Sequence, residues 1–212
     1  MGIADLLPML AAGTHKVTLN QLAGMIVAID GYAWLHKSVF NCAEDLVLGR
    51  ATSRHLQYLM HRIEKLLHAG VVPFVVLDGG ALGSKEGTER EREAKRQQAL
   101  KRAKTARMLG RHEEARAHFV KAVDVTPLMA RHWILALRQR GVRYVVAPYE
   151  ADAQLAFLAR AGLADAVLCE DSDLIPFGCP RVLFKFEAKD ARTRQRSVPH
   201  RALPDCKKEL ST

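Results

Sequence analysis

Short apolar runs alternate along this chain with longer segments in which apolar residues recur every three or four positions. Four of the runs have the length and composition of buried strands: Met25 to Ile29, Val72 to Leu77, Tyr144 to Val146 and Ala166 to Cys169. Strands that are apolar on both faces are typical of parallel sheets with helices on both sides. The pattern therefore predicts an α/β domain with a mostly parallel central sheet flanked by helices.

Three segments between these runs have helical periodicity. The first starts at Ser53, a favourable N-cap residue, carries its apolar side chains on one face and ends at Gly70. The second follows Tyr149 and stops near Gly162, and the third runs from Pro127 to Arg140. A helix between successive strands is the connection that a parallel sheet requires.

The segment from Lys85 to Arg111 has a different composition. It holds ten Lys or Arg against four Asp or Glu, with almost no large apolar residue before Leu100 and with strong helix formers throughout. Its acids come early and its bases late, which suits the helix dipole. We expect a helix that has no face to bury in a core, and its composition fits a solvated helix and a polyanion-binding helix equally.

Composition narrows the class of protein. The formal charge is +9 at pH 7, which favours a polyanionic partner, and nucleic acid more than a membrane. No apolar run approaches the roughly 20 residues that span a bilayer. The four cysteines are widely spaced, as in a cytosolic or nuclear protein with reduced thiols. Residues 187–212 are polar and Arg-rich without a periodic apolar face, so we expect a disordered tail after one domain over residues 1–186.

Acidic residues follow each of the four predicted strands. In chain order they are Asp30, Asp78, Glu150 with Asp152, and Glu170 with Asp171 and Asp173. One acid at a strand end is most often a helix cap, but the carboxyl ends of parallel strands share one edge, so acids after four strands should converge. A cluster of hard oxygen ligands favours Mg²⁺ or Mn²⁺ over zinc. Two such ions can activate water and stabilise both oxygens of a phosphodiester displacement.

Five motifs, in this order and at this spacing, resemble those of the structure-specific 5′ nucleases, with the exonuclease branch of the family nearest. They are "MGIADLL", "VAIDGYAWLHK", "FVVLDGGALGSK", "VAPYEADAQLAFL" and "EDSDLIPFG". The resemblance implies a PIN-like 5′ nuclease fold with a basic helical arch over about residues 84–122. It also implies Mg²⁺-dependent hydrolysis of DNA from a 5′ end or at a 5′ flap, in DNA repair, including mismatch repair, in the nucleus.

The resemblance further implies metal ligands, some of them acting through water. The ligands around one ion are Asp30, Asp78, Glu150 and Asp152, and those toward a second ion are Asp171 and Asp173. Glu170 is implied to lie beside the ligands or in solvent.

DNA contacts are implied in the same way. Lys85 and Arg92 would act as catalytic residues that stabilise charge on the scissile phosphate. Tyr32 would stack on the terminal nucleotide and His36 would contact phosphate or base. Gly2 is implied to lie close to the substrate by its backbone. Lys95 and Arg96 are further candidate DNA-binding residues, with contact to solvent alone as the alternative.

The resemblance stops after Phe186, where the family continues with a further ligand and a duplex-binding element. The C-terminal part of the family domain is therefore expected to be missing and the second metal site to be incomplete, as in a truncated, alternatively spliced or mispredicted product with impaired activity. Two alternatives stay open: an inactive fragment that binds DNA through its basic arch, and a PIN-like RNA nuclease. We expect a monomer whose partner is DNA with a 5′ end or flap.

Overall fold

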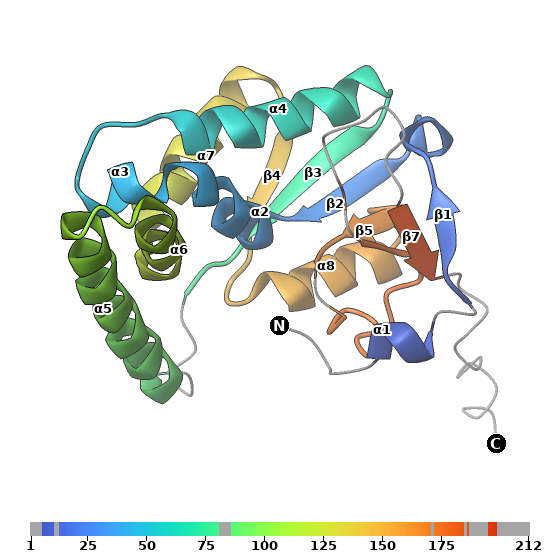
Figure 1. The fold of residues 1–212 in the computed structure, drawn as a ribbon. Coiled ribbons are helices and arrows are strands. Elements are labelled where there is room, and N and C mark those ends of the chain that lie inside the picture. The colour runs from blue at the N-terminus through green and yellow to red at the C-terminus, as the bar shows by residue number, and fades with distance from the viewer. Residues whose placement is uncertain are drawn as a thin grey trace.

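The computed structural model describes residues 6–10, 13–80, 86–170, 172–184, 186 and 195–198. Within them lies a seven-stranded sheet with the strand order β1-β7-β6-β5-β2-β3-β4 (Figure 1). The strands are β1 (His15–Val17), β2 (Ile26–Asp30), β3 (Val72–Leu77), β4 (Arg143–Val146), β5 (Ala166–Leu168), β6 (Val182–Phe184) and β7 (Gln195–Val198). The five strands from β6 to β4 are parallel, and β7 is antiparallel to β6 and β1. The predicted α/β class and mostly parallel sheet are confirmed.

Helices cover both faces of this sheet. On one face lie α2 (Gly31–Ser38), α4 (Arg54–His68) and α7 (Pro127–Gln139), and on the other lies α8 (Ala151–Arg160) (Figure 1). Alternate residues of β2 point to the two faces: Val27 and Ile29 pack with α4 and α7, whereas Ala28 packs with α8. This two-sided burial is why β2, β3 and β5 carry apolar residues almost throughout, whereas β4 lies at the edge of the sheet and is only partly buried.

The predicted helices are confirmed, with one difference in capping. Ser53 precedes α4 as expected, but its side chain makes no cap hydrogen bond, and its hydroxyl accepts from the Gln57 amide at 3.3 Å. Thr126, which the sequence analysis did not single out, caps α7, and its hydroxyl accepts from the Met129 N–H at 3.4 Å. The remaining helices are α1 (Leu6–Met9), the 3₁₀ helices η2 (Leu19–Leu22) and η3 (Phe40–Cys42), α3 (Ala43–Val47), α5 (Glu86–Met108) and α6 (His112–Ala122). None of the described helices has the length and apolarity needed to cross a membrane.

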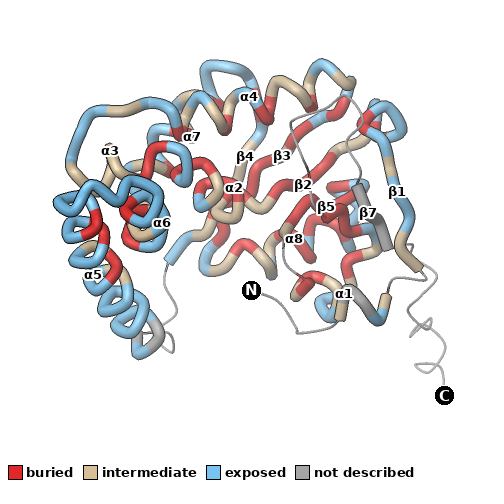
Figure 2. Tube along the Cα trace, in the orientation of Figure 1, coloured by how far each residue is buried: buried red, intermediate tan, exposed pale blue. Residues whose placement is uncertain are grey.

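Helices α5 and α6 form a hairpin at the side of the sheet where β2 and β3 end (Figure 1). The expectation that the basic helix buries no face is wrong for its second half. Ala99, Ala103 and Ala106 are buried, and the latter two pack with Phe119 of α6 (Figure 2). Alanine lets two helices approach closely, so this contact needs none of the large apolar residues that the sequence lacks.

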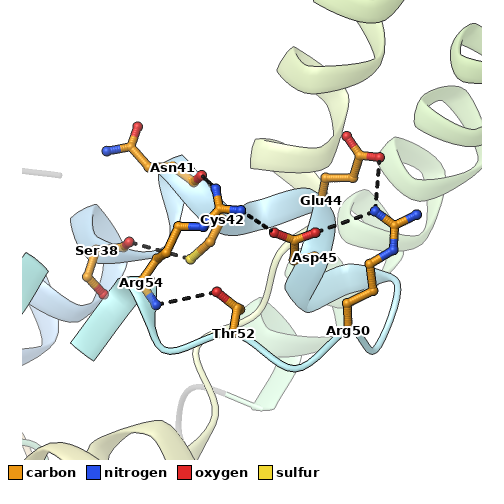
Figure 3. A network of polar contacts seen from close by, with 8 residues as sticks. All are labelled: Ser38, Asn41, Cys42, Glu44, Asp45, Arg50, Thr52 and Arg54. Carbon is orange, nitrogen blue, oxygen red and sulfur yellow. Dashed lines mark hydrogen bonds and ion pairs between the residues drawn. The ribbon is translucent and has the colours of Figure 1, made fainter. Parts of the chain in front are cut away.

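A polar network joins the hairpin to the helices on the sheet. Asp45 of α3 pairs with Arg54 at 3.0 Å and with Arg50 at 3.4 Å (Figure 3). The neighbouring Glu44 pairs with Arg107 of α5 at 3.1 Å. Each of these exposed pairs contributes less than about 1 kcal/mol. Together with the alanine contact, however, they fix the second half of α5 against α3 and the start of α4.

Part of the predicted tail is ordered in the sheet. The expectation of disorder is wrong for Gln195–Val198, which form β7 between β1 and β6. The sequence of this strand, "QRSV", has no apolar alternation to reveal it, because its place in the sheet rests on backbone pairing. The rest of residues 187–212 lies outside the described residues, so the domain boundary at residue 186 stays a prediction.

A buried arginine on α4 holds Phe186 in the core. Arg62 is 1% exposed, and its guanidinium carbon lies 4.1 Å from the centroid of the Trp34 ring and 4.7 Å from that of Phe186. It donates to the Tyr58 hydroxyl at 2.8 Å and to the Phe186 carbonyl at 2.9 Å. The stack and these hydrogen bonds offset the cost of burying the charge, which lowers the pKa of Arg62.

We expect Arg62→Ala to lower the free energy of unfolding by about 3 kcal/mol, because it opens a cavity and leaves the Phe186 carbonyl without its donor. Urea unfolding followed by circular dichroism measures the change. The matched control is Arg131→Ala, on an exposed position of α7, which should stay within about 0.5 kcal/mol of the parent. Equal losses in the two variants would contradict this account of Arg62.

Candidate active site at the carboxyl edge of the sheet

Two of the predicted acids end neighbouring strands and also cap helices. Asp30 is the last residue of β2, beside Val76 of β3, and its carboxylate accepts from the Ala33 N–H at 3.1 Å at the start of α2. Asp78 follows β3 directly and accepts from the Ala151 N–H at 2.7 Å at the start of α8. The second contact draws the 150–152 segment to the end of β3, so acids from distant parts of the sequence meet at one edge.

Two glycines that the sequence analysis did not single out make this convergence possible. A Cβ on Gly79 would lie 1.8 Å from the Ala147 carbonyl oxygen, and the Gly79 N–H donates to the Tyr149 carbonyl at 2.6 Å. A Cβ on Gly31 would lie 2.7 Å from the Val76 carbonyl oxygen. The signal in the sequence was the Asp-Gly pair after each of the first two apolar runs, where backbones approach too closely for a side chain.

The carboxylates at this edge influence one another. Burial raises the pKa of Asp30 from 3.8 to about 7, and the charges of Asp152 and Asp78 add to the rise against the opposing effect of the Ala33 hydrogen bond. Asp30 is therefore costly to ionise without a counter-charge. Three of the predicted ligands, Asp30, Asp78 and Asp152, thus lie within electrostatic reach of one another, and a cation beside them would reduce this cost.

Tyr32 and His36 of α2 stand beside the same acids. Burial and the charge of Asp78 raise the pKa of Tyr32. Desolvation lowers the pKa of His36, whose charge also interacts with Asp124, Arg92, Asp78 and Arg96. His36 thus lies within electrostatic reach of both the acidic edge and the basic helix α5, and its lowered pKa favours the neutral imidazole.

The other predicted acids lie around the start of α8. Glu150 is the N-cap residue of α8, Asp152 is in its first turn, and both are half-buried. Asp173 is half-buried in the turn after β5, where its neighbour Leu174 packs with the core on the α8 side. Burial, together with the charge of Asp152, raises the pKa of Cys179 in the same turn to about 11, which places this turn near α8.

Glu170 forms an ion pair with Lys37 of α2. The Lys37 ammonium lies 2.6 Å from the Glu170 carboxylate, which links the end of β5 to the helix that carries Tyr32 and His36. This ion pair therefore holds the segment that follows β5, just before residue 171, against α2.

The predicted cations of the arch differ in their surroundings. Arg92 and Lys95 are exposed on α5, and Arg92 lies 3.6 Å from Glu89. Arg96 is less exposed and pairs with three carboxylates. Gly2, Lys85 and Asp171 lie outside the described residues.

The chemistry of the donor set fits a hard divalent cation, since the convergent groups are carboxylate oxygens. Among the described residues, no three His, Cys, Asp or Glu side chains are close enough together to form a complete ligand group. The described part of the edge thus provides converging oxygen donors and a buried carboxyl group, and the predicted ligand Asp171 is not among its described members.

Two family models match the chain. "XPG N-terminal domain" matches residues 1–99 and "XPG I-region" matches residues 141–212. The second match extends over residues 187–212, past the expected end of the resemblance at Phe186, whereas the alignment with exonuclease 1 of Arabidopsis thaliana covers 187 residues, the length that this expectation implies. Residues 187–212 are polar in composition, so the sequence analysis did not predict the strand β7 (Gln195–Val198) within them.

A curated relative and two solved structures are similar to this chain. Exonuclease 1 of Arabidopsis thaliana is 48% identical over 187 residues, which cover 88% of this chain and 25% of that protein. The catalytic core of Rad2 in complex with DNA substrate has a TM-score of 0.69 at 22% identity, over 93% of this chain and 53% of that one. GEN1 in complex with product DNA and Mg²⁺ has a TM-score of 0.56 at 20% identity, over 92% of this chain and 40% of that one. The predicted 5′ nuclease fold is confirmed, and the chain spans about a quarter of the length of the Arabidopsis relative.

The raised pKa of Asp30 predicts how stability depends on pH without metal. The contribution of Asp30 to the free energy of unfolding is fully present below the pKa that Asp30 has in the unfolded chain. It is lost as the pH rises through the pKa of about 7 that Asp30 has in the folded protein. Asn at this position keeps the cap and carries no charge. In chelator, Asp30→Asn should therefore be more stable than the parent at pH 8 by about 1–3 kcal/mol, and the difference should shrink at pH 5.

Urea unfolding of the parent and of Asp30→Asn at several pH values measures this difference in stability. Groups that titrate alike in the two proteins cancel from the difference. Glu113→Gln, an exposed position on α6, serves as the control for loss of one negative charge. An equal gap between parent and Asp30→Asn at both pH values would show that Asp30 has no raised pKa.

Proposed function

We propose that this chain, which belongs to the XPG family of 5′ nucleases, carries the nuclease region of a metal-dependent DNA exonuclease of the exonuclease 1 type. It would hydrolyse phosphodiesters near a free 5′ end and also cleave 5′ flaps. The observation that carries the proposal is the electrostatic coupling of Asp30, Asp78 and Asp152 at one edge of the sheet, beside the basic helix α5. A role in nuclear DNA repair, including mismatch repair, is part of the proposal and follows from the family resemblance.

The similar proteins support the choice of substrate and cofactor. The Rad2 core was solved with DNA substrate, and GEN1 with product DNA and Mg²⁺. The chain is 48% identical to a protein named exonuclease 1 over 187 residues. We extend DNA and Mg²⁺ to this chain on that basis, with Mn²⁺ as a substitute.

Six carboxylates would hold the metal, directly or through water. They are Asp30, Asp78, Glu150 and Asp152 around one ion, and Asp171 and Asp173 toward a second. Bound Mg²⁺ would supply Lewis-acid chemistry that activates water and stabilises charge on the phosphate. Asp30 would release the proton that its raised pKa otherwise retains near neutral pH, because a neighbouring cation favours its ionised form.

The remaining predicted residues would bind and orient the DNA. Arg92 and Lys85 would bind the scissile phosphate from the side of α5, and Tyr32 would stack on the terminal base. His36 has a lowered pKa, so it would contact the DNA as a neutral hydrogen-bonding group. Gly2 and Lys95 remain proposed DNA contacts.

A second candidate is a DNA-binding protein without turnover. The observation that favours it is the presence of exposed bases on α5, Arg92 and Lys95 among them. Phosphate contacts made by the exposed bases of α5 would survive loss of the metal, and such binding would weaken steeply with salt.

A cleavage assay separates the two candidates. The parent is incubated with 5′-recessed and 5′-flap duplexes, with Mg²⁺ or chelator, beside a version extended by the downstream nuclease region of a relative. We expect Mg²⁺-dependent release of nucleotides that Asp173→Ala reduces by at least about 100-fold, as for loss of a metal ligand. Glu113→Gln is the control and should match the parent.

The outcomes assign the function directly. Product from the extended version alone supports the binding protein, cleavage in chelator contradicts the metal mechanism, and preference for a matched RNA supports an RNA nuclease. Salt-dependent DNA binding by the parent, measured in parallel, checks that an inactive sample is folded.

Metal binding can be tested without activity. If the carboxylates bind Mg²⁺, an excess of Mg²⁺ at pH 8 should raise the melting temperature of the parent by about 3 °C through ligand linkage. Asp30→Asn should lose most of this rise, whereas Glu113→Gln should keep it. The same rise in Asp30→Asn as in the parent would rule out Asp30 as a ligand.

A further inference from the structure

Arg96 is held by carboxylates on three sides. Its guanidinium nitrogens lie 2.7 Å from Glu89, 2.9 Å from Glu93 and 3.1 Å from Asp124. Its side chain is 20% exposed, and the carboxylates raise its pKa despite the opposing effect of burial. A DNA phosphate would therefore have to compete with these three carboxylates for the guanidinium of Arg96.

Arg96 is also the point at which the first half of α5 meets the rest of the protein. Among the residues from 87 to 98 whose side chains are described, all are exposed except Arg96 (Figure 2). Buried residues of α5 begin at Ala99, and the pair between Arg107 and Glu44 lies still later. The packing that fixes the second half of the helix therefore does not extend to the half that carries Arg92.

Asp124 is the member of this cluster that lies outside α5. It follows α6 and precedes α7, whose Trp133 and Leu137 are fully buried in the core on the sheet. Glu89 and Glu93 belong to α5 itself and move with it. Among the described residues, the 3.1 Å contact between Arg96 and Asp124 thus ties the first half of α5 to a fixed part of the molecule.

Arg92 lies one helical turn before Arg96. Residues four apart share a face of a helix and are about 6 Å apart along its axis. Arg92, Arg96, Asp124 and Asp78 all lie within electrostatic reach of His36, so α5 and the acidic edge both influence this side chain. Because Arg92 and Arg96 share a helix face, fixing Arg96 also fixes the rotation of α5 at Arg92, whose charge lies within electrostatic reach of His36.

We propose that Asp124 is a positioning residue, whose ion pair with Arg96 holds Arg92 toward the scissile phosphate. Arg96, predicted from sequence as a DNA contact, serves in this proposal as the anchor of α5. The proposal rests on the proposed nuclease function, because Arg92 has a reacting phosphate to contact only if the acidic edge is catalytic.

The first test separates cleavage from binding in the chain, or in its extended version if that alone is active. Asp124→Asn removes one negative charge near the DNA, so its affinity for a 5′-flap duplex should be equal or higher. Its single-turnover cleavage should nevertheless be about 10-fold slower, because Arg92 is no longer held in place. Asp124→Glu should restore the rate, and the control Glu113→Gln should leave both quantities unchanged. Cleavage by Asp124→Asn at the parental rate would overturn the proposal.

The second test needs no activity. Amide hydrogen exchange in free protein should become several-fold faster across residues 87–98 in Asp124→Asn and in Arg96→Gln, but not across residues 99–108, which the alanine contact holds. The double variant should add nothing to either single change, because both remove the same contact. If neither the chain nor its extended version cleaves DNA, the proposed function fails, and exchange still decides whether Asp124 holds α5. Parental exchange rates over residues 87–98 in Asp124→Asn would overturn the positioning role.

Discussion

The parallel register of β2 and β3 imposes an electrostatic constraint on the rest of the molecule. It places Asp30 beside Val76, two residues before Asp78, so that two carboxylates end neighbouring strands at the same edge. Burial makes the first of them hard to ionise. Hydrogen bonds from helix N-termini, Ala33 to Asp30 and Ala151 to Asp78, offset part of this cost and hold both carboxylates at the starts of α2 and α8. The same side chains can therefore stabilise the fold as caps and serve a cation as ligands.

This edge depends equally on two places where side chains are absent. Gly79 lets the chain after β3 cross the chain before α8 in direct backbone contact, and the Ala151 N–H then reaches Asp78. Gly31 does the same between the start of α2 and the end of β3. The acids are thus brought together by backbone contacts that precede any metal, which is consistent with a site organised by the fold.

The central strands could be predicted from sequence because each is buried on both faces and is therefore apolar throughout. Strands β1, β6 and β7 could not be predicted: two are three residues long, and β7 is polar and held by backbone pairing to its neighbours. The buried face of α5 was missed for a related reason, since Ala99, Ala103 and Ala106 give little apolar signal while they allow close helix packing.

The acids of the candidate site followed from strand order and family resemblance, and the structure brings Asp30, Asp78 and Asp152 within electrostatic reach of one another. Sequence could not distinguish the environments of the basic residues on α5. Arg92 and Arg96 share a residue type, a helix and a face, yet one is exposed and the other is enclosed by carboxylates. The difference arises from Asp124, a residue distant in sequence whose position depends on how α7 packs on the sheet.

The two halves of α5 are consequently held by different physical forces. The second half is held mainly by apolar contact between alanines and Phe119, which salt does not weaken. The first half is held by a partly exposed ion pair, and salt screens such pairs over about 8 Å at physiological ionic strength. DNA carries the same kind of charge as the carboxylates that hold Arg96, so a phosphate entering beside α5 competes with them for the same cations. The position of the second half of α5 is therefore insensitive to salt, whereas the position of its first half depends on the charges around Arg96.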